Sequence, residues 1–298
     1  MYQAGVGFNF KETPDVMRKI LIPTDFSENA FNALKYAVDL LKYELSEFYI
    51  MHAFQDDIYA DEDLIEKEGL ENVTRSVSEN SEEQLKDIVT NIKDFSPNPN
   101  HSFFIVSSNN VLVDEAETIV EKENIDLIIM GTKGRTNDKT ITFGSHALQV
   151  IKYVPCPVLA IPVNFKYTQP KHILFPTNYL IPYKRRELKL LCEMASPYRA
   201  VIDMLYISAS EKLSMRQKDN QNFIKETLCK NELRFKVEKS KHFINTIYKY
   251  IKENHIDMLV MVNTRHSFLE DIIEQSKVDE LSLNIDIPFL ALQNLKRE

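Results

Sequence analysis

Short apolar runs alternate with helical patterns along the first half of the chain. The apolar runs predict strands, because they are short and are bounded by polar or turn-forming residues; they cover residues 20–23, 48–53, 102–106, 127–130 and 158–162. The intervening segments predict helices, at about 27–41, 61–95, 111–123 and 145–153. Such alternation is typical of a parallel sheet covered by helices on both faces.

Three segments of the first half return, little changed, in the second half. The first pair is separated by 153 positions and the other two by 131 positions: 19–25 with 172–178, 124–130 with 255–261, and 156–161 with 287–292. The sequence therefore predicts two copies of one unit, of which the second has lost 22 residues from its middle.

The repeat sets the predicted domain boundaries. Residues 1–16 match nothing in the second copy and are expected to be a poorly packed N-terminal extension. The first domain is placed at 17–164 and the second at 171–298, with a polar linker between them that ends at Pro170. A length of 298 residues agrees with two domains, since one domain usually has ~100–200 residues.

Composition narrows the class of protein. Hydrophobic residues make up 44% and charged residues 27%, which is ordinary for a soluble globular chain. No apolar stretch approaches the ~20 residues of a membrane helix, and no signal peptide is visible, so a cytoplasmic location is expected. The net charge of −8 argues against a nucleic-acid surface. Three widely spaced cysteines, Cys156, Cys192 and Cys229, are expected to be reduced.

Glycine is scarce but concentrated in one segment. The chain has six glycines, about 2% where ~7% is usual, and three of them are Gly131, Gly134 and Gly144. This segment leaves a predicted strand and ends where a helix begins. Glycines let a ligand approach the backbone, and a helix start presents unsatisfied N–H groups and partial positive charge. The segment therefore predicts a phosphate site, to which Ser145 adds a hydroxyl donor, although three glycines can also serve turns alone.

Asp25 follows the first strand, and the glycine segment follows the fourth. Doubly wound sheets bind ligands at the carboxyl ends of strands, where the winding reverses. If these two strands are neighbours, Asp25 faces the glycine loop and can accept from a ribose hydroxyl or hold a phosphate-bound metal. It can instead cap the helix near Ser27. Lys133 and Arg135 either contact phosphate or are solvated, and the acid-rich stretch 56–68 is either a solvated helix start or a shield over the cleft.

These residues resemble the universal stress protein family. Its nucleotide-binding members carry glycine, two residues, glycine, nine residues, glycine, and then serine or threonine. The spacing of Gly131, Gly134, Gly144 and Ser145 matches this pattern without gaps. The segments PTDFS, IDLIIMG and PCPVL, which begin at residues 23, 125 and 155, also look like family signatures. The resemblance covers roughly 17–163 strongly and 171–295 weakly.

The resemblance implies an α/β fold of two doubly wound five-stranded parallel sheets, of the adenine nucleotide alpha hydrolase type, arranged as a tandem repeat. It implies ATP, with or without Mg²⁺, as the ligand, and no catalytic residue and no other metal are assigned. The implied contacts are Pro23, Thr24 and Asp25 at the nucleoside, Ala53 at the adenine side, Met130 in the same cleft, Gly131, Gly134, Gly144 and Ser145 at the phosphates, and Arg135 and His146 beside them.

The second copy departs at these positions. Asp25 becomes Asn178, and the three loop glycines become Val262, Arg265 and Gln275, whereas Ser145 is kept as Ser276. Valine is poorly suited to positive φ, and the longer side chains fill space that a ligand needs. We therefore expect no nucleotide in the second half.

Three functions are compatible with the sequence. The first is an ATP-binding sensor or regulator of the stress response without catalysis. The second is a slow ATPase or self-phosphorylating enzyme, for which Asp25, Asp138 and His146 are the candidate groups. The third is a nucleotide-free interaction module, which the intact first-half motif argues against. An unidentified protein partner is expected, as is an internal pseudo-dimer through pairing of 158–162 with 288–292; a homodimer is a further option.

Overall fold

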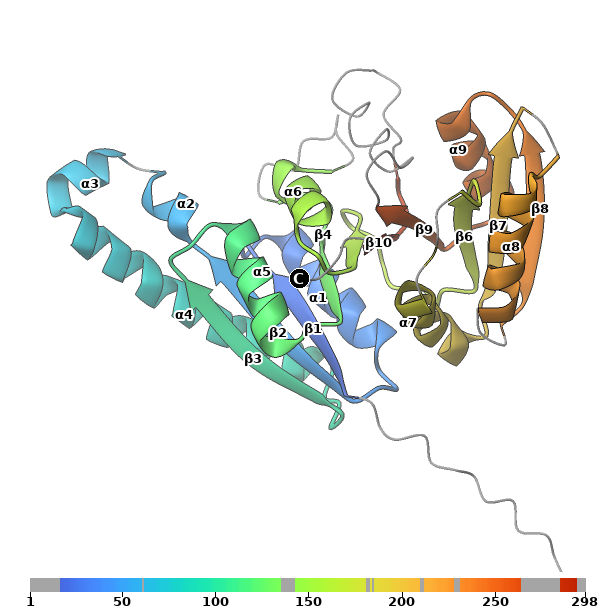
Figure 1. Ribbon diagram of the computed structural model, residues 1–298. Helices are drawn as coiled ribbons and strands as arrows, with labels where there is room; N and C mark the ends of the chain where they lie inside the picture. Colours follow the sequence, from blue (N-terminus) through green and yellow to red (C-terminus); the bar gives the residue numbers. More distant parts are fainter. Residues whose placement is uncertain are drawn as a thin grey trace, which may run out of the picture.

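The computed structural model describes residues 17–60, 62–134, 143–180, 183, 185–209, 212–227, 231–263 and 285–293 (Figure 1). The predicted extension at 1–16 lies outside these ranges. The described elements of the first half are β1 (Arg18–Pro23), α1 (Glu28–Leu40), β2 (Ser46–Ala53), α2 (Gln55–Ile58), α3 (Glu62–Glu68), α4 (Leu70–Phe95), β3 (His101–Ser108), α5 (Leu112–Glu123), β4 (Leu127–Gly131), α6 (Ser145–Tyr153) and β5 (Val158–Ile161).

The described elements of the second half are β6 (His172–Thr177), α7 (Arg185–Ala195), the 3₁₀ helix η1 (Ser196–Tyr198), β7 (Val201–Ser208), α8 (Met215–Thr227), β8 (Leu233–Lys239), α9 (Phe243–Glu253), β9 (Met258–Asn263) and β10 (Phe289–Gln293). The five strands predicted for the first half are all present, each within two residues of its expected bounds.

The prediction of one continuous helical region at 61–95 was wrong. It consists of two helices, α3 and α4, which are separated at Gly69. Gly69 has a φ of 82°, a left-handed conformation that glycine adopts without a steric penalty and that no α-helix contains. The prediction missed this break because the polar, helix-favouring composition continues on both sides of the glycine.

The strands form one ten-stranded sheet in the order β3-β2-β1-β4-β5-β10-β9-β6-β7-β8. Within each half the neighbouring strands are parallel, and the second half repeats the strand order of the first. The two halves join where β5 and β10 pair antiparallel. This arrangement confirms the predicted fold class and the predicted pairing of 158–162 with 288–292.

Side chains at alternating positions along the strands pack into two separate cores, one on each face of the sheet. Ile20 and Ile22 of β1 point to one face of the sheet, where α1, α4, α7 and α8 pack. Leu21 points to the other face, where α5, α6 and α9 pack. This is the period-two alternation of a strand buried on both sides. Both cores continue across the junction between the halves, since each contains buried residues of β4, β5, β9 and β10.

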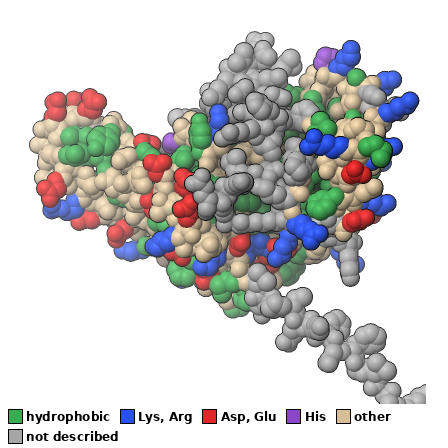
Figure 2. Space-filling view, viewed as in Figure 1, with side chains coloured by type: hydrophobic (Ala, Val, Ile, Leu, Met, Phe, Trp, Pro, Cys, Tyr) green, Lys and Arg blue, Asp and Glu red, His purple; other side chains and the backbone are tan. Residues whose placement is uncertain are grey.

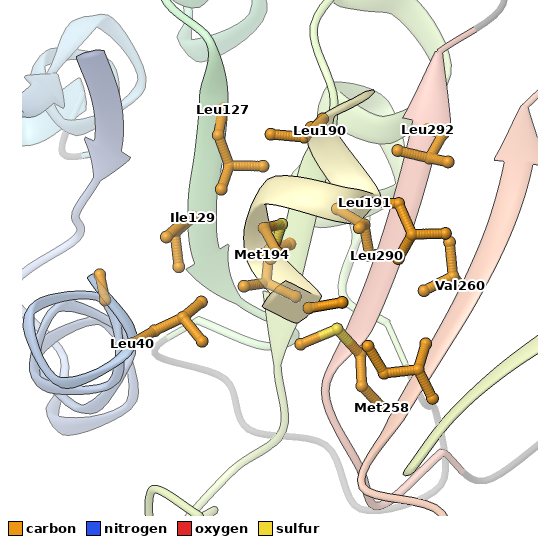
Figure 3. Packing of buried hydrophobic residues seen from close by; sticks show 14 of the residues in the cluster. Leu40, Leu127, Ile129, Leu190, Leu191, Met194, Met258, Val260, Leu290 and Leu292 are labelled. Carbon is orange, nitrogen blue, oxygen red and sulfur yellow. The ribbon is translucent and has the colours of Figure 1, made fainter. Parts of the chain in front are cut away.

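Figure 3 shows how the halves pack together on one face of this junction, where leucine and methionine side chains of α1, α7, β4, β9 and β10 meet. Polar contacts accompany them: Tyr198 donates from its hydroxyl to the carbonyl of Leu40 at 2.5 Å, and the buried Arg18 bridges Glu44 at 2.6 Å and Glu193 at 3.2 Å. Burying a large apolar side chain stabilises a protein by roughly 1.5–3 kcal/mol, so this apolar contact contributes more than its polar rim.

The predicted linker is packed rather than loose. The rings of Phe165 and Tyr167 lie 6.0 and 5.3 Å from the ring of Tyr36, and Asn32 of α1 donates to the carbonyl of Phe165 at 3.0 Å.

Charged side chains are distributed unevenly over the surface. Figure 2 shows Asp and Glu side chains over the projecting end of the first half that carries α3, and Lys and Arg side chains over the part of the second half that carries β8.

Candidate functional site

A cavity of about 280 Å³ opens at the carboxyl ends of β1, β2 and β4. The winding of the first half reverses between β1 and β4, which is the position where doubly wound sheets bind ligands. Ten of the residues predicted at the nucleotide line this cavity: Pro23, Thr24, Asp25, Ala53, Met130, Gly131, Gly134, Gly144, Ser145 and His146. The remaining predicted residue, Arg135, lies outside the described ranges.

The turn after β1 holds Asp25 in a defined position. Thr24 Oγ1 accepts from the backbone N–H of Phe26 at 3.1 Å, and Phe26 has a φ of 63°. Asp25 Oδ1 accepts from the N–H and the hydroxyl of Ser27, at 3.1 and 2.6 Å. Ser27 in turn caps α1, since its hydroxyl accepts from the N–H of Ala30 at 3.2 Å. Asp25 therefore organises the helix start through Ser27, and it does so while lining the cavity.

Two of the loop glycines are required by side chains from α1 and from the turn that precedes it. A Cβ at Gly131 would lie 2.5 Å from Asn29 Nδ2, and a Cβ at Gly134 would lie 2.6 Å from Asp25 Oδ2. Both distances are far shorter than van der Waals contact. Gly134 thus faces Asp25, as predicted from the neighbouring positions of β1 and β4. The expected need for positive φ was wrong for Gly131, which is the last residue of strand β4.

Gly144 has a different explanation. Its φ of −68° and ψ of 164° suit any residue, and a Cβ there would meet Lys133 Cα at 3.6 Å, an ordinary contact. Gly144 N donates to the carbonyl of Thr132 at 2.8 Å, which closes the loop at the start of α6. Packing against the described residues therefore does not demand glycine at this position, whereas close approach of a ligand would.

The N-terminus of α6 points at the same cavity. Gly144 is its N-cap residue and has no side chain with which to cap it, and Ser145, His146 and Ala147 of the first turn line the cavity. The first N–H groups of a helix lack intrahelical acceptors and carry partial positive charge. Ser145 and His146 are exposed, so the first turn of α6 is accessible to solvent. We call this arrangement, from Gly131 to Gly134 and from Gly144 to Ala147, the anion cup.

A buried histidine forms the wall on the β2 side. His52 Nδ1 lies 2.9 Å from Ser81 Oγ, and His52 Nε2 lies 3.2 Å from Asp57 Oδ2. Its ring centroid is 4.4 Å from that of Phe26. Contacts at both ring nitrogens fix the orientation of the imidazole. A second hollow of about 520 Å³ shares Asp25, His52 and Asp57 with the first, so the space extends beneath α4.

Sequence reasoning did not assign five of the lining residues, namely Ala30, His52, Leu112, Thr132 and Ala147, and it left open the roles of three more, Lys133, Asp56 and Asp57. Most of them follow closely after a strand of the first half, and a systematic reading of such positions would have found them. Asp56 and Asp57 begin the acid-rich stretch, of which the later residues Glu62, Asp63 and Glu66 are solvated. Within the described residues, no group of three or more His, Cys, Asp or Glu side chains is arranged to hold a metal ion.

The turn after β6 repeats the local structure of the turn after β1. Thr177 Oγ1 accepts from the N–H of Tyr179 at 2.9 Å, and Tyr179 has a φ of 55°. Here, however, the hydroxyl of Tyr183 also bonds the Thr177 hydroxyl, and Gln217 Nε2 donates to the carbonyl of Asn178 at 2.8 Å. The chain's own side chains thus surround this turn. Three predicted counterparts of loop residues lie outside the described ranges: Arg265, Gln275 and Ser276.

Comparison with known proteins gives a consistent result. Residues 17–162 match the model of the universal stress protein family. The universal stress protein MJ0577 of Methanocaldococcus jannaschii is 31% identical over 163 residues, which covers 48% of this chain and 94% of that protein. A second protein of that organism, the universal stress protein MJ0531, is 29% identical over 147 residues, covering 49% of this chain and 83% of that protein.

A solved structure resembles the whole chain. It is a universal stress protein from Archaeoglobus fulgidus, with a TM-score of 0.65 and 18% identity, and the match covers 92% of this chain and 96% of that one. At this identity the likeness concerns the fold. Of the helices that the structure describes, none has the length and hydropathy needed to cross a bilayer. The sequence motifs, the fold and these relatives together show that the chain belongs to the universal stress protein family.

Proposed function

We propose that the first half of this chain binds ATP in the anion cup and that the chain acts as a nucleotide-dependent regulator in the stress response rather than as an enzyme. The nucleotide-binding domain spans residues 17–164, and residues 171–298 form a second copy of the same unit that binds no nucleotide. We place the protein in the cytoplasm. Mg²⁺ is an optional companion of the phosphates.

The observation that carries the proposal is the anion cup itself. Backbone N–H groups at the start of α6 and the described glycines of the loop line one cavity. Gly144 has no side chain to cover these N–H groups, although its packing against the described residues does not require glycine. Phosphate oxygens are the ligands that such a helix start favours. Asp25 lines the same cavity beside Gly134, where a carboxylate is suited to a ribose hydroxyl.

The regulatory assignment follows from what surrounds the cup. A γ-phosphate is hydrolysed when a base or a positioned water lies in line with it. His146 is exposed, and its Nε2 lies 3.8 Å from Asp56 Oδ2, so the described groups present no buried general base at the helix start. Occupancy of the site, rather than turnover, is then the signal that partners read.

The test begins with the purified full-length chain. We expect denaturation to release ATP, and calorimetric titration of the nucleotide-free chain to give one ATP per chain rather than two. Turnover of ATP with Mg²⁺ should stay at the background rate. At ATP a hundredfold above its dissociation constant, linkage adds about 2.7 kcal/mol to the stability of the folded state, which a thermal melt detects.

Each alternative has its own signature in the same measurements. Steady production of ADP that a change at Asp25 abolishes would favour an ATPase. Two ATP molecules per chain would contradict a ligand-free second half. Absence of released nucleotide, together with an unchanged melting temperature in ATP, would leave the interaction module as the remaining function.

A further inference from the structure

The second half of the chain contacts the short helix α6, whose N-terminus forms part of the anion cup. Phe143 immediately precedes the helix cap and is 4% exposed. Its ring centroid lies 5.4 Å from that of Phe289, the fully buried first residue of β10. The residue that precedes the cap of α6 therefore packs against a side chain from the opposite half.

The other end of α6 is held by two amide side chains. Asn263 Nδ2, at the end of β9, and Gln293 Nε2, at the end of β10, both donate to the carbonyl of Ile151, at 2.9 and 2.6 Å. Asn263 Nδ2 also lies 2.9 Å from Gln293 Oε1, which closes the group into a triangle. The last four carbonyls of a helix have no intrahelical partner, so these donors satisfy a group that would otherwise be unpaired.

The position of Asn263 gives this contact its significance. Asn263 directly follows Val262, which stands where the first copy has Gly131. In the first half, the segment after Gly131 begins the glycine loop. In the second half, the equivalent segment supplies the Asn263 side chain, which donates to the end of α6 in the first half. Gln293 is 7% exposed, so its bond to Ile151 is shielded from competing water.

We propose that Asn263 and Gln293 are positioning residues for the ATP site: they hold α6 so that its N-terminal N–H groups point into the anion cup. The inference rests on the proposed ATP binding. A helix of nine residues is only about 14 Å long and moves as a rigid rod. A shift at Ile151 is therefore passed to Ser145, where hydrogen bonds to phosphate depend on a few tenths of an ångström. The second half thus acts on the site without binding the ligand.

The test uses the full chain with the double change Asn263→Ala and Gln293→Met. This change removes both N–H donors, and methionine has about the length and size of the glutamine that it replaces. The dissociation constants of ATP and of adenosine are measured by calorimetry. Adenosine lacks phosphates and reports only the nucleoside wall. We expect ATP to bind about tenfold more weakly, which corresponds to about 1.4 kcal/mol, and adenosine affinity to change less than about twofold.

The matched control is Asn254→Ala. Asn254 Nδ2 donates to the carbonyl of Tyr250 at 3.0 Å near the end of α9, so it is the same kind of bond on a helix remote from the cup. This variant should lose less stability than the double variant, because Asn254 is exposed and the Tyr250 carbonyl keeps the backbone N–H of Asn254 as a donor. Its ATP affinity should stay as in the wild type. If the double variant does not fold, Gln293→Glu alone serves, because it keeps the size and the acceptor for Asn263 but replaces the donor to Ile151.

The outcomes separate this inference from the function on which it rests. A selective loss of ATP over adenosine supports positioning of the phosphate-side helix. Equal losses of both ligands, or an unchanged ATP affinity in a folded variant, overturn it while leaving ATP binding intact. A wild-type chain that binds neither ligand overturns the proposed function first, and the positioning role with it.

Discussion

A Gly144→Ala substitution should weaken nucleotide binding while leaving the free energy of unfolding nearly unchanged. The backbone at Gly144 has φ −68° and ψ 164°, which alanine adopts without strain. Among the described residues, the nearest atoms to the added methyl are Lys133 Cα at 3.6 Å and the carbonyl oxygen of Thr132 at 3.7 Å, both ordinary contacts. Alanine is a poorer N-cap residue than glycine but restricts the unfolded chain. These effects oppose each other, so the free energy of unfolding without ligand should change by less than about 0.5 kcal/mol.

Binding should respond much more strongly. A phosphate oxygen accepting from a backbone N–H sits about 2.9 Å from that nitrogen, and a methyl carbon at the helix cap needs about 3.5 Å of its own. The oxygen must therefore retreat, and at least one charge-assisted hydrogen bond is lost, at about 1.5–3 kcal/mol. We expect ATP affinity to fall about tenfold or more.

The comparison variant is Gly134→Ala. Its Cβ would lie 2.6 Å from Asp25 Oδ2, and that carboxylate is tied to Ser27 by two hydrogen bonds, so it cannot yield freely. Overpacking of this kind costs typically 1–3 kcal/mol, which should lower the urea midpoint before any ligand is added. Urea denaturation without nucleotide therefore separates the two variants: Gly134→Ala should be less stable than the wild type, whereas Gly144→Ala should keep its stability and lose ATP affinity in calorimetry.

One result would refute this reasoning about Gly144. If the Gly144→Ala chain keeps its stability and also binds ATP as tightly as the wild type, then the phosphates do not approach the start of α6. A general loss of stability in the same variant would instead show that packing, and not a ligand, demands glycine there.

Three further predictions follow from particular contacts. Arg18→Met should destabilise the chain by about 2 kcal/mol in urea denaturation, because two charged hydrogen bonds to Glu44 and Glu193 are lost; a change below about 0.5 kcal/mol would contradict a structural role for the bridge. Burial lowers the pKa of His101 from its usual 6.5, so the folded state resists protonation. Stability is therefore fully present above pH 6.5 and falls as the pH drops below it towards the lowered pKa, and His101→Gln should flatten that decline; parallel curves would refute it. Asp25→Asn should weaken ATP and adenosine equally if the carboxylate accepts from ribose, whereas a loss seen only with Mg²⁺ would assign it to a metal.

Much of the fold was accessible from the sequence because its signals are local. Apolar runs bounded by polar segments located β1 to β5, and the recurrence of 19–25 at 172–178 indicated the second set of strands. Edge pairing of β5 with β10 was also predictable, since an open sheet leaves N–H and C=O groups of its last strand without partners. The sequence spacing of the glycines placed them at one end of the sheet.

The remaining features depend on side chains that meet only in three dimensions. No local pattern says that Asn29 packs beside Gly131, so positive φ was invoked where close contact is the cause. The donors from Asn263 and Gln293 to Ile151 join residues 112 and 142 positions apart. Such polar contacts leave no periodicity in the sequence, and they became visible only when both halves were placed together.

The contacts in the first half also bear on the proposal that the second half keeps the fold without the nucleotide site. Gly134 is needed because Asp25 occupies the space where its Cβ would be, and Gly131 is needed because Asn29 does the same. At the offsets of the proposed duplication, Asp25 becomes Asn178 and Asn29 becomes Pro182, while the two glycines become Arg265 and Val262. Each glycine and the side chain that requires it have changed together. Val262, the residue before the last of β9, is 5% exposed and belongs to the core. The site is therefore a set of mutually dependent residues on a sheet that does not depend on them.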